Sequence, residues 1–206
     1  MQKTSAPYIS HLSKDKKLGK LLAQQEAIKL SKRKQIYLHL CSSIMSQQLS
    51  TRVAEVIHKR LLKLYAGKPT PQKLLDTPFD TLRAIGLSNA KTKYIQNVAR
   101  FTLEKGMDPK ILHKMDNEEL IEHFTQIKGV GRWTAEMLLM FTLGREDVFA
   151  VDDLGIQNAM IRVYKLDKTD KKKLRDDMLR ISAKWSPYRT FACLHLWRHK
   201  DNAPVS

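Results

Sequence analysis

Apolar residues recur at spacings of three and four along most of the chain, and the strict alternation of a half-buried strand is scarce. Such spacing places apolar side chains on one face of a helix. We therefore expect an all-α protein. The pattern predicts helices over residues 18–30, 36–46, 51–65, 71–75, 80–85, 88–104, 117–124, 132–143, 153–163, 171–185 and 187–197.

Polar residues that accept hydrogen bonds precede several of these ranges. An oxygen at the N-cap satisfies free N–H groups in the first turn of a helix. Ser50 or Thr51, Ser88, Asp152 and Ser186 stand in this position. They predict where four of the helices begin.

The charge balance of the chain indicates what kind of partner the protein binds. The 206 residues include 37 Lys and Arg against 21 Asp and Glu, a formal net charge of +16. Such an excess favours a polyanionic partner, above all nucleic acid. A basic surface that only aids solubility is the alternative. The basic runs at 14–20 and 168–173 are interpreted as solvated faces of helices.

The chain lacks the marks of a secreted or membrane protein. Residues 1–13 are mixed and polar, and the longest wholly apolar run, 137–141, is too short to cross a bilayer. We expect a cytoplasmic protein without membrane association, at the nucleoid in a bacterium or in the nucleus of a eukaryote. Cys41 and Cys193 lie in apolar helical patterns, which suits reduced core thiols. Two cysteines cannot supply the four ligands of an iron–sulfur cluster.

Two glycines one residue apart, Gly129 and Gly131, precede an apolar helical run. Glycines let a turn pass close to a partner, and the free N–H groups and positive dipole end of a helix start bind anions. Lys128 and Arg132 add positive charge to the same turn. A Gly-x-Gly also occurs in ordinary tight turns. With a helix before it and small residues after it, however, the segment predicts a phosphate-binding helix–hairpin–helix.

The sequence Ile-Lys-Gly-Val-Gly-Arg-Trp-Thr-Ala at 127–135, followed by Val-Asp-Asp-Leu-Gly at 151–155, resembles the helix–hairpin–helix (HhH-GPD) DNA glycosylases. Within them it is similar to the alkylbase group, DNA-3-methyladenine glycosylase II. Further matches at 44–51, 85–95 and 184–197 follow in the same order. The resemblance covers about residues 35–200.

The resemblance implies one glycosylase domain over residues 1–206, built of two helical lobes with an active-site cleft between them. Lobe A is expected at about 1–36 plus 150–206, and lobe B at about 37–149. The implied protein is a monomeric, monofunctional DNA glycosylase of base excision repair. It would flip alkylated purines such as 3-methyladenine and 7-methylguanine out of double-stranded DNA and hydrolyse their N-glycosidic bond. A non-catalytic helix–hairpin–helix module that binds DNA structure or lesions is the alternative.

By position, the resemblance assigns catalysis to Asp153, because a carboxylate stabilises the positive charge that develops on the sugar. Asp152 is the runner-up, and we interpret it as an N-cap. Bifunctional relatives place a lysine where this chain has Trp133. An indole cannot form a Schiff base, so no lyase activity is expected.

The resemblance also implies a base pocket walled by Trp133 and Trp197, with Tyr37 as a weaker member. A Trp face attracts a desolvated cation such as an alkylated purine by about 2 kcal/mol. Trp185 is interpreted as a packing residue. His195 and His199 have a zinc-like spacing but lack a third ligand, so we interpret them as a packing and a surface histidine.

DNA contacts are expected from a wedge segment, from a second loop and from the hairpin. Gln48 is the foremost wedge residue. The hairpin carbonyls are expected to hold Na⁺ or K⁺, by analogy with related hairpins, and no other cofactor is expected. The DNA-contacting residues are Gln47, Gln48, Leu49, Ser88, Lys91, Lys128, Gly129, Val130, Gly131 and Arg132, and the cation-binding carbonyls are those of Gln126, Lys128 and Val130.

Overall fold

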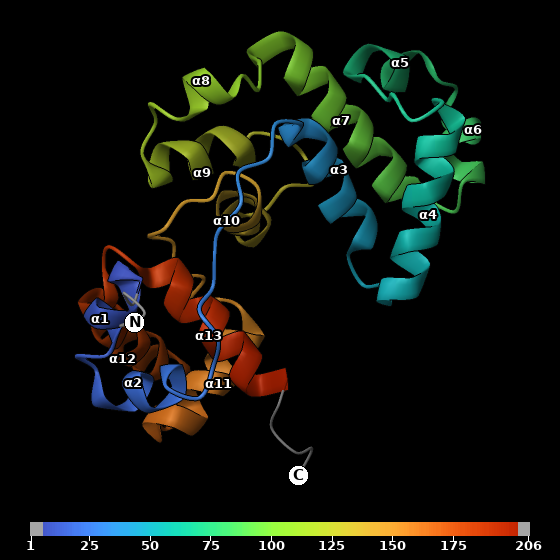
Figure 1. Ribbon diagram of the computed structural model, residues 1–206. Helices are drawn as coiled ribbons and strands as arrows, with labels where there is room; N and C mark the ends of the chain where they lie inside the picture. Colours follow the sequence, from blue (N-terminus) through green and yellow to red (C-terminus); the bar gives the residue numbers. More distant parts are fainter. Residues whose placement is uncertain (1–5, 202–206) are drawn as a thin grey trace. The chain divides into compact units, whose positions relative to one another are not determined.

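The computed structural model describes residues 6–201, which form helices and no strands (Figure 1). The expectation of an all-α protein is confirmed. The chain divides into two compact units. Unit 2 is Lys32–Leu143, and unit 1 comprises the described residues up to Ser31 and from Gly144 onward. None of the described helices combines the length and apolar character needed to cross a membrane.

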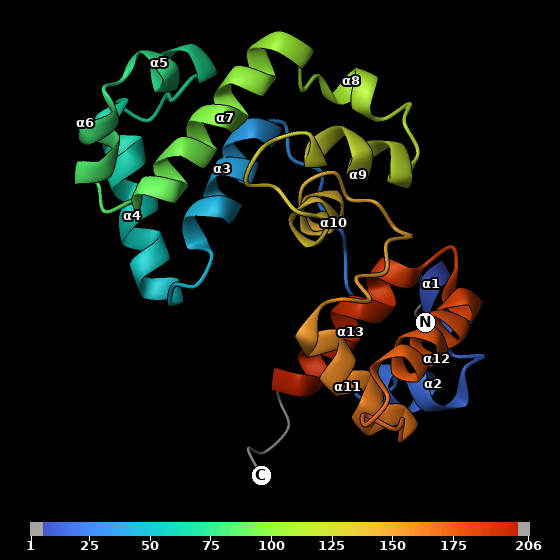
Figure 2. The same ribbon diagram turned by 180° about the vertical axis from the view of Figure 1, so that it is seen from behind.

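Unit 2 is built around α3 and α7, which pack against each other. Helix α3 also contacts α4 and α10, α7 contacts α5 and α6, and α9 packs on α10, as can be followed in Figures 1 and 2. Leu40, Ile44, Ile95 and Phe124 are fully buried in its core. The helices are α3 (Ile36–Ser46), α4 (Thr51–Leu64), α5 (Pro71–Asp76), α6 (Phe79–Ala84), α7 (Asn89–Lys105), α8 (Pro109–Leu112), α9 (Asn117–Thr125) and α10 (Arg132–Phe141).

Unit 1 gathers both ends of the described chain around α13, which packs on α2 and α11. Trp185 is 1% exposed, and its indole N–H donates to Asp15 at 3.2 Å. Its interpretation as a packing residue is confirmed. The helices are α1 (Pro7–Leu12), α2 (Lys16–Leu22), α11 (Leu154–Tyr164), α12 (Lys171–Ser182), the 3-10 turn η1 (Ala183–Trp185) and α13 (Arg189–Asp201).

Both cysteines are buried free thiols, as the sequence predicts. Cys41 lies in the core of unit 2 and Cys193 in that of unit 1, and neither is exposed. Burial raises the pKa of Cys41 to about 12. This thiol therefore stays protonated and unreactive at neutral pH.

The helix expected at 18–30 ends at Leu22. Beyond it, backbone and side-chain groups bond to other parts of unit 1 instead of continuing the helix. The N–H of Ile28 donates to the hydroxyl of Tyr8 at 2.6 Å, and Oε1 of Gln25 accepts from Nδ1 of His195 at 2.7 Å. Burial, with the charge of Arg198, lowers the pKa of His195 to about 4. His195 is a packing residue, as interpreted from the sequence.

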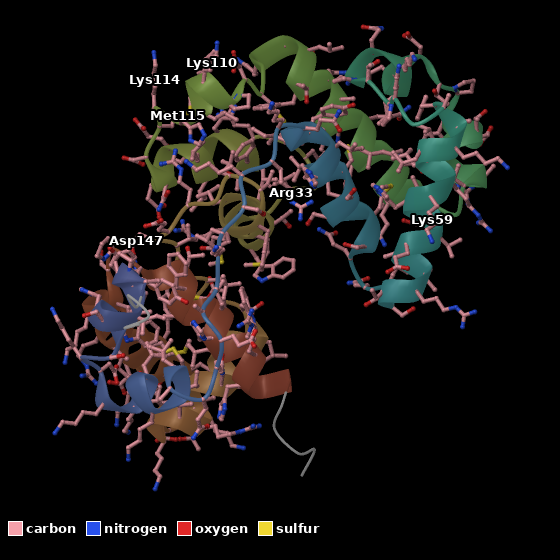
Figure 3. All side chains as sticks on the ribbon, viewed as in Figure 1. Arg33, Lys59, Lys110, Lys114, Met115 and Asp147 are labelled. Atoms are coloured by element: carbon pink, nitrogen blue, oxygen red, sulfur yellow. The ribbon has the colours of Figure 1, made fainter. Side chains whose placement is uncertain are left out.

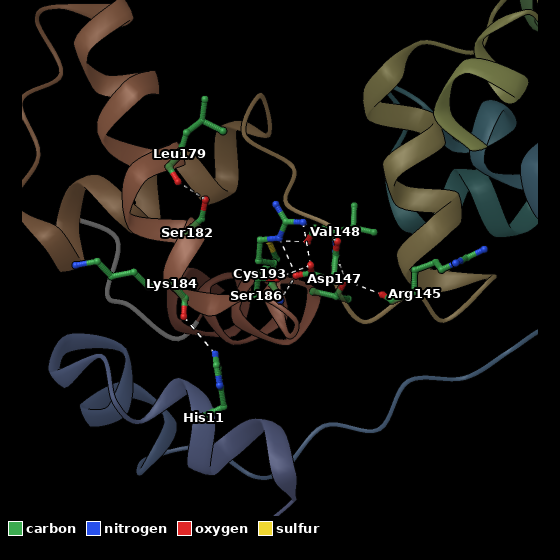
Figure 4. Close-up of polar contacts among 11 residues, drawn as sticks. His11, Arg145, Asp147, Val148, Leu179, Ser182, Lys184, Ser186 and Cys193 are labelled. Carbon is green, nitrogen blue, oxygen red and sulfur yellow. Dashed lines mark hydrogen bonds and ion pairs between the residues drawn. The ribbon is translucent and has the colours of Figure 1, made fainter. Parts of the chain in front are cut away.

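Asp147 anchors the chain where it enters unit 1 (Figure 4). Its carboxylate accepts from Nε of Arg189 at 2.7 Å, from Nη2 of Arg189 at 2.9 Å and from Oγ of Ser186 at 2.8 Å. Ser186 is thus not the helix cap that the sequence predicts, and α13 begins at Arg189. Burial raises the pKa of Asp147, but the bonds from Arg189 and Ser186 outweigh it, so the net pKa is lowered.

We predict that Asp147→Asn lowers the free energy of unfolding by about 2 kcal/mol at pH 7, because charge-assisted hydrogen bonds are lost. A lowered pKa in the folded state contributes stability above the unfolded pKa of about 4, and this contribution is lost as pH falls through the folded value. The two proteins should therefore converge as pH falls through the lowered pKa of Asp147. Urea unfolding at several pH values measures this. Asp177→Asn, which breaks the exposed pair with Arg180, should cost less than about 0.5 kcal/mol.

Candidate functional site

The glycine turn joins α9 to α10 in unit 2. The N–H of Val130 donates to the carbonyl of Ile127 at 2.9 Å, and these two side chains are 5% and 2% exposed. Lys128, by contrast, is exposed. Buried apolar side chains therefore anchor the turn, while Lys128 and Gly131 are exposed.

Gly129 is required by the fold itself. Its φ is 106°, and an added Cβ would lie 2.7 Å or less from three ring carbons of Tyr94 on α7. From the same helix, Nδ2 of Asn97 donates to the carbonyl of Lys128 at 3.0 Å. Gly131 differs, because its φ is −91° and an added Cβ would meet nothing within 4 Å. Neither a positive φ nor a collision requires a glycine at this position, which is the N-cap of α10.

Arg132, at the start of α10, is held by carboxylates. Its Nη atoms donate to Glu118 at 3.0 and 2.6 Å, and its Nε donates to Glu136 at 3.1 Å. The hydrogen bonds that Arg132 donates to Glu118 are the main cause of its raised pKa. Sequence reasoning expects a phosphate contact from this residue. The structure instead places its donors in the joint between α9 and α10.

The expected wedge segment is the turn between α3 and α4. Gln47 points inward, and its Nε2 donates to Oγ1 of Thr134 at 3.3 Å. Gln48 is exposed, with φ 56°, and Leu49 is 37% exposed. A positive φ is uncommon for glutamine and often marks functional strain. Gln48 and Leu49 are therefore exposed to solvent, whereas the side chain of Gln47 is partly buried and bonded to Thr134.

Ser88 and Lys91 meet at the start of α7. Ser88 is the N-cap, as the sequence predicts, and its Oγ accepts from the N–H of Lys91 at 3.2 Å. The ammonium of Lys91 donates to the carbonyls of Met45 and Gln47 at 2.9 and 2.6 Å. Burial lowers the pKa of Lys91. The ammonium of Lys91 is therefore bound to carbonyl groups of the protein. The sequence prediction, in which it contacts a phosphate, does not include these bonds.

Asp153 is the N-cap of α11, and its Oδ1 accepts from the N–H of Ile156 at 2.8 Å. The interpretation of Asp152 as this cap is wrong, because the helix begins one residue later than predicted. Asp152 is exposed and forms an ion pair with Arg175. The two adjacent carboxylates therefore have different surroundings.

The same oxygen of Asp153 also accepts from the indole N–H of Trp197 at 2.8 Å. Gly155 makes room for this bond, since an added Cβ would lie 3.0 Å from both Nε1 and Cδ1 of Trp197. Both the carboxylate and the indole are half-buried. Two of the sequence-predicted site residues are thus in direct contact within unit 1.

Trp133 stands on the surface of unit 2, 42% exposed. Met137 and Phe141 follow it at intervals of four along α10, so the three side chains share a face of the helix. Tyr37 lies on α3, and its hydroxyl donates to the carbonyl of Pro69.

A cavity of about 690 Å³ lies between α3, α4 and α10. Met137 and Phe141 line it, and Oγ of Ser42 hydrogen-bonds Nδ1 of His58 at 2.9 Å in its wall. Arg33 and Lys59, labelled in Figure 3, also line it. Sequence reasoning misses these polar residues. The regular spacing of His39, Ser42, Ser43 and Ser46 along one face of α3 is the signal that could have found them.

The hairpin carbonyls retain the means to hold a cation. The carbonyl of Lys128 accepts from Asn97, but a carbonyl oxygen has a second lone pair. The donor set, neutral carbonyl oxygens, suits a hard cation. Separately, no three or more His, Cys, Asp or Glu side chains among residues 6–201 are grouped to bind a metal.

Comparison with known proteins identifies the fold. Two helices joined by a glycine turn, as α9 and α10 are here, form a helix–hairpin–helix. Residues 41–184 match the model of the HhH-GPD superfamily base excision DNA repair protein. DNA-3-methyladenine glycosylase 1 of Schizosaccharomyces pombe is 36% identical over 187 residues, 89% of this chain and 80% of that protein. The chain belongs to the HhH-GPD superfamily, as its motifs indicate.

Two solved structures agree with this assignment. The fission yeast 3-methyladenine DNA glycosylase in complex with abasic DNA superposes with a TM-score of 0.82 at 34% identity, covering 98% of this chain and all of that one. The DNA-3-methyladenine glycosidase of Bacillus halodurans gives a TM-score of 0.85 at 34% identity, covering 97% of this chain and 91% of that one.

The two hairpin glycines should respond differently to alanine. We predict that Gly129→Ala lowers the free energy of unfolding by about 3 kcal/mol, from backbone strain and the collision with Tyr94. Gly131→Ala should cost less than about 1 kcal/mol, yet weaken DNA binding because the methyl group keeps a phosphate from the backbone N–H groups. Thermal unfolding and DNA titration measure the two effects. Tight DNA binding by Gly131→Ala would contradict the assignment of this turn to phosphate.

Proposed function

We propose that this protein is a DNA-3-methyladenine glycosylase that removes alkylated purines from double-stranded DNA by hydrolysis. The observation that carries the proposal is the carboxylate of Asp153, fixed at the start of α11 by two hydrogen bonds on one oxygen. Its relative in fission yeast, 36% identical, is a DNA-3-methyladenine glycosylase. Substrates of the 3-methyladenine and 7-methylguanine type are part of the proposal.

Asp153 supplies the negative charge that this reaction needs. As the bond between base and deoxyribose breaks, positive charge develops on the sugar, and a nearby carboxylate stabilises it. The hydrogen bonds from Ile156 and Trp197 to one oxygen restrain the orientation of this carboxylate. A water molecule then adds to the anomeric carbon and loses a proton. The alkylated purine leaves as a neutral base, because it carried a positive charge before the bond broke.

Trp133 supports recognition of such a base. Its exposed indole can stack on any base, and it attracts a cationic purine more than a neutral one. Met137 and Phe141 extend the same face of α10 with apolar surface. Selection by charge together with stacking suits alkylated purines as a class.

The exposed turns of unit 2 support DNA binding. The backbone N–H groups near Gly129 and Gly131, with exposed Lys128, would hold a phosphate, and the hairpin carbonyls would hold Na⁺ or K⁺. Gln48 would fill the gap left by the extruded nucleotide, since it projects from its turn while Gln47 is tied to Thr134.

We predict that Asp153→Asn reduces base release from methylated DNA by at least about a thousandfold, the order found when a key electrostatic group is removed. Asparagine is an equally good N-cap, so the fold should persist. Asp152→Asn, which only breaks the exposed pair with Arg175, should keep its activity. Chromatography of released 3-methyladenine and 7-methylguanine measures both variants. Wild-type protein that binds DNA but releases neither base would favour the non-catalytic module.

The absence of a lysine at position 133 predicts the mechanism. Water, not a protein amine, should attack the sugar, so borohydride should trap no covalent protein–DNA adduct and the strand should remain intact. Gel electrophoresis after borohydride treatment and, separately, after alkali measures both points. Alkali should cleave the abasic product only after base release. A trapped adduct in the wild-type protein would contradict the monofunctional mechanism.

A further inference from the structure

Lys91 extends from the first turn of α7 to the end of α3. Its backbone N–H donates to Ser88, which fixes where its side chain starts. Its ammonium donates to the carbonyls of Met45 at 2.9 Å and Gln47 at 2.6 Å. One lysine therefore joins two segments that lie more than 40 residues apart.

Both carbonyls belong to the end of α3, which closes at Ser46. The last carbonyl groups of a helix have no partner inside it, and a cation there is also favoured by the helix dipole. Lys91 uses two of its three ammonium hydrogens on them. Without it these carbonyls would lose their charged donor.

The carbonyl of Gln47 belongs to the peptide group that leads into Gln48. Gln48 has a φ of 56°, a left-handed conformation that is unfavourable for a residue with a side chain. Holding the oxygen of Gln47 fixes the plane of this peptide group. The side chain of Gln47 is held as well, by Thr134. The support from Lys91 thus reaches the one residue of the turn that is both strained and exposed.

We infer that Lys91 is a positioning residue for base extrusion. It holds the turn at 47–50 in the conformation that carries Gln48 into the gap left by the extruded nucleotide. The inference rests on the proposed function, which supplies the extrusion step. An ammonium engaged with two carbonyls is a support for the turn and not a docking charge for phosphate.

The two roles differ in their dependence on salt. A lysine that neutralises a phosphate contributes about 0.9 to the slope of log K against log salt concentration. A lysine that acts only on the turn contributes nothing to this slope but controls how fast the gap is filled. Salt dependence and gap filling therefore separate the two roles in one set of variants.

The test compares Lys91→Met with wild type, with Lys91→Arg and with Lys93→Met. Lys93 is an exposed neighbour, so its substitution removes the same charge without touching the turn. The probe is a duplex with a tetrahydrofuran abasic-site analogue opposite 2-aminopurine, whose fluorescence reports on filling of the gap. This probe cannot undergo base release, so the signal is independent of chemistry.

For Lys91→Met we expect the same slope of log K against log salt concentration as for wild type, and a DNA affinity within about threefold of the wild-type value. The fluorescence change should slow by about tenfold or more, a barrier increase of about 1.4 kcal/mol. Lys91→Arg should recover part of the rate, and Lys93→Met should keep it. Where circular dichroism shows that Lys91→Met does not fold, Lys91→Gln takes its place.

A salt slope lowered by about 0.9 together with an unchanged fluorescence rate would overturn the inference. So would equal slowing by Lys93→Met. A wild-type protein that fills the gap in a Lys91-dependent way but releases no methylated purine refutes the proposed function alone. A wild-type protein that releases the base, with a fluorescence rate insensitive to Lys91, refutes the inference alone.

Discussion

The ring of Tyr94 lies against Gly129, and this contact determines how closely the hairpin turn approaches α7. Asn97, about one helical turn after Tyr94 on α7, bonds the same hairpin turn. Lys91, about one helical turn before Tyr94, bonds the turn that follows α3. Helix α7, 17 residues long, therefore supports both exposed turns of unit 2. Its own position is fixed by Ile95 and other fully buried side chains. The packing of α7 in the core thus sets the spacing of these two turns, as a precise binding site requires.

The large positive charge of the chain has two separate uses. Spread over the surface, a net charge of +16 attracts DNA at long range, and this attraction weakens strongly as the salt concentration rises. Close to the site, individual cations serve the fold. Arg132 joins α9 to α10 through Glu118, Arg175 neutralises Asp152, and Lys91 closes the end of α3. The number of basic residues near a motif therefore overstates the number available to a phosphate.

Periodicity predicts the long helices, because each must bury a continuous apolar face. The four-residue α8 has too few turns to show such a period. The sequence prediction places the N-cap of α11 one residue too early. Either Asp152 or Asp153 can cap a helix, and the apolar periodicity does not distinguish between adjacent positions. Family resemblance locates the hairpin and Trp197. It does not reveal that Trp197 binds Asp153, because that contact spans 44 residues and depends on how α13 packs on α11.

Gly155 explains why the order of residues in the segment Val-Asp-Asp-Leu-Gly matters. An added Cβ at Gly155 would lie 3.0 Å from the carboxylate of Asp153 and from the indole of Trp197, so a side chain there would crowd the bond between them. The indole then restrains one carboxylate oxygen, while the charge of Asp152 is paired with Arg175. Two neighbouring aspartates thus differ in their surroundings, one oriented by hydrogen bonds and the other ion-paired. Under the proposed function, this difference in environment, rather than residue type, selects the carboxylate that acts on a cationic sugar.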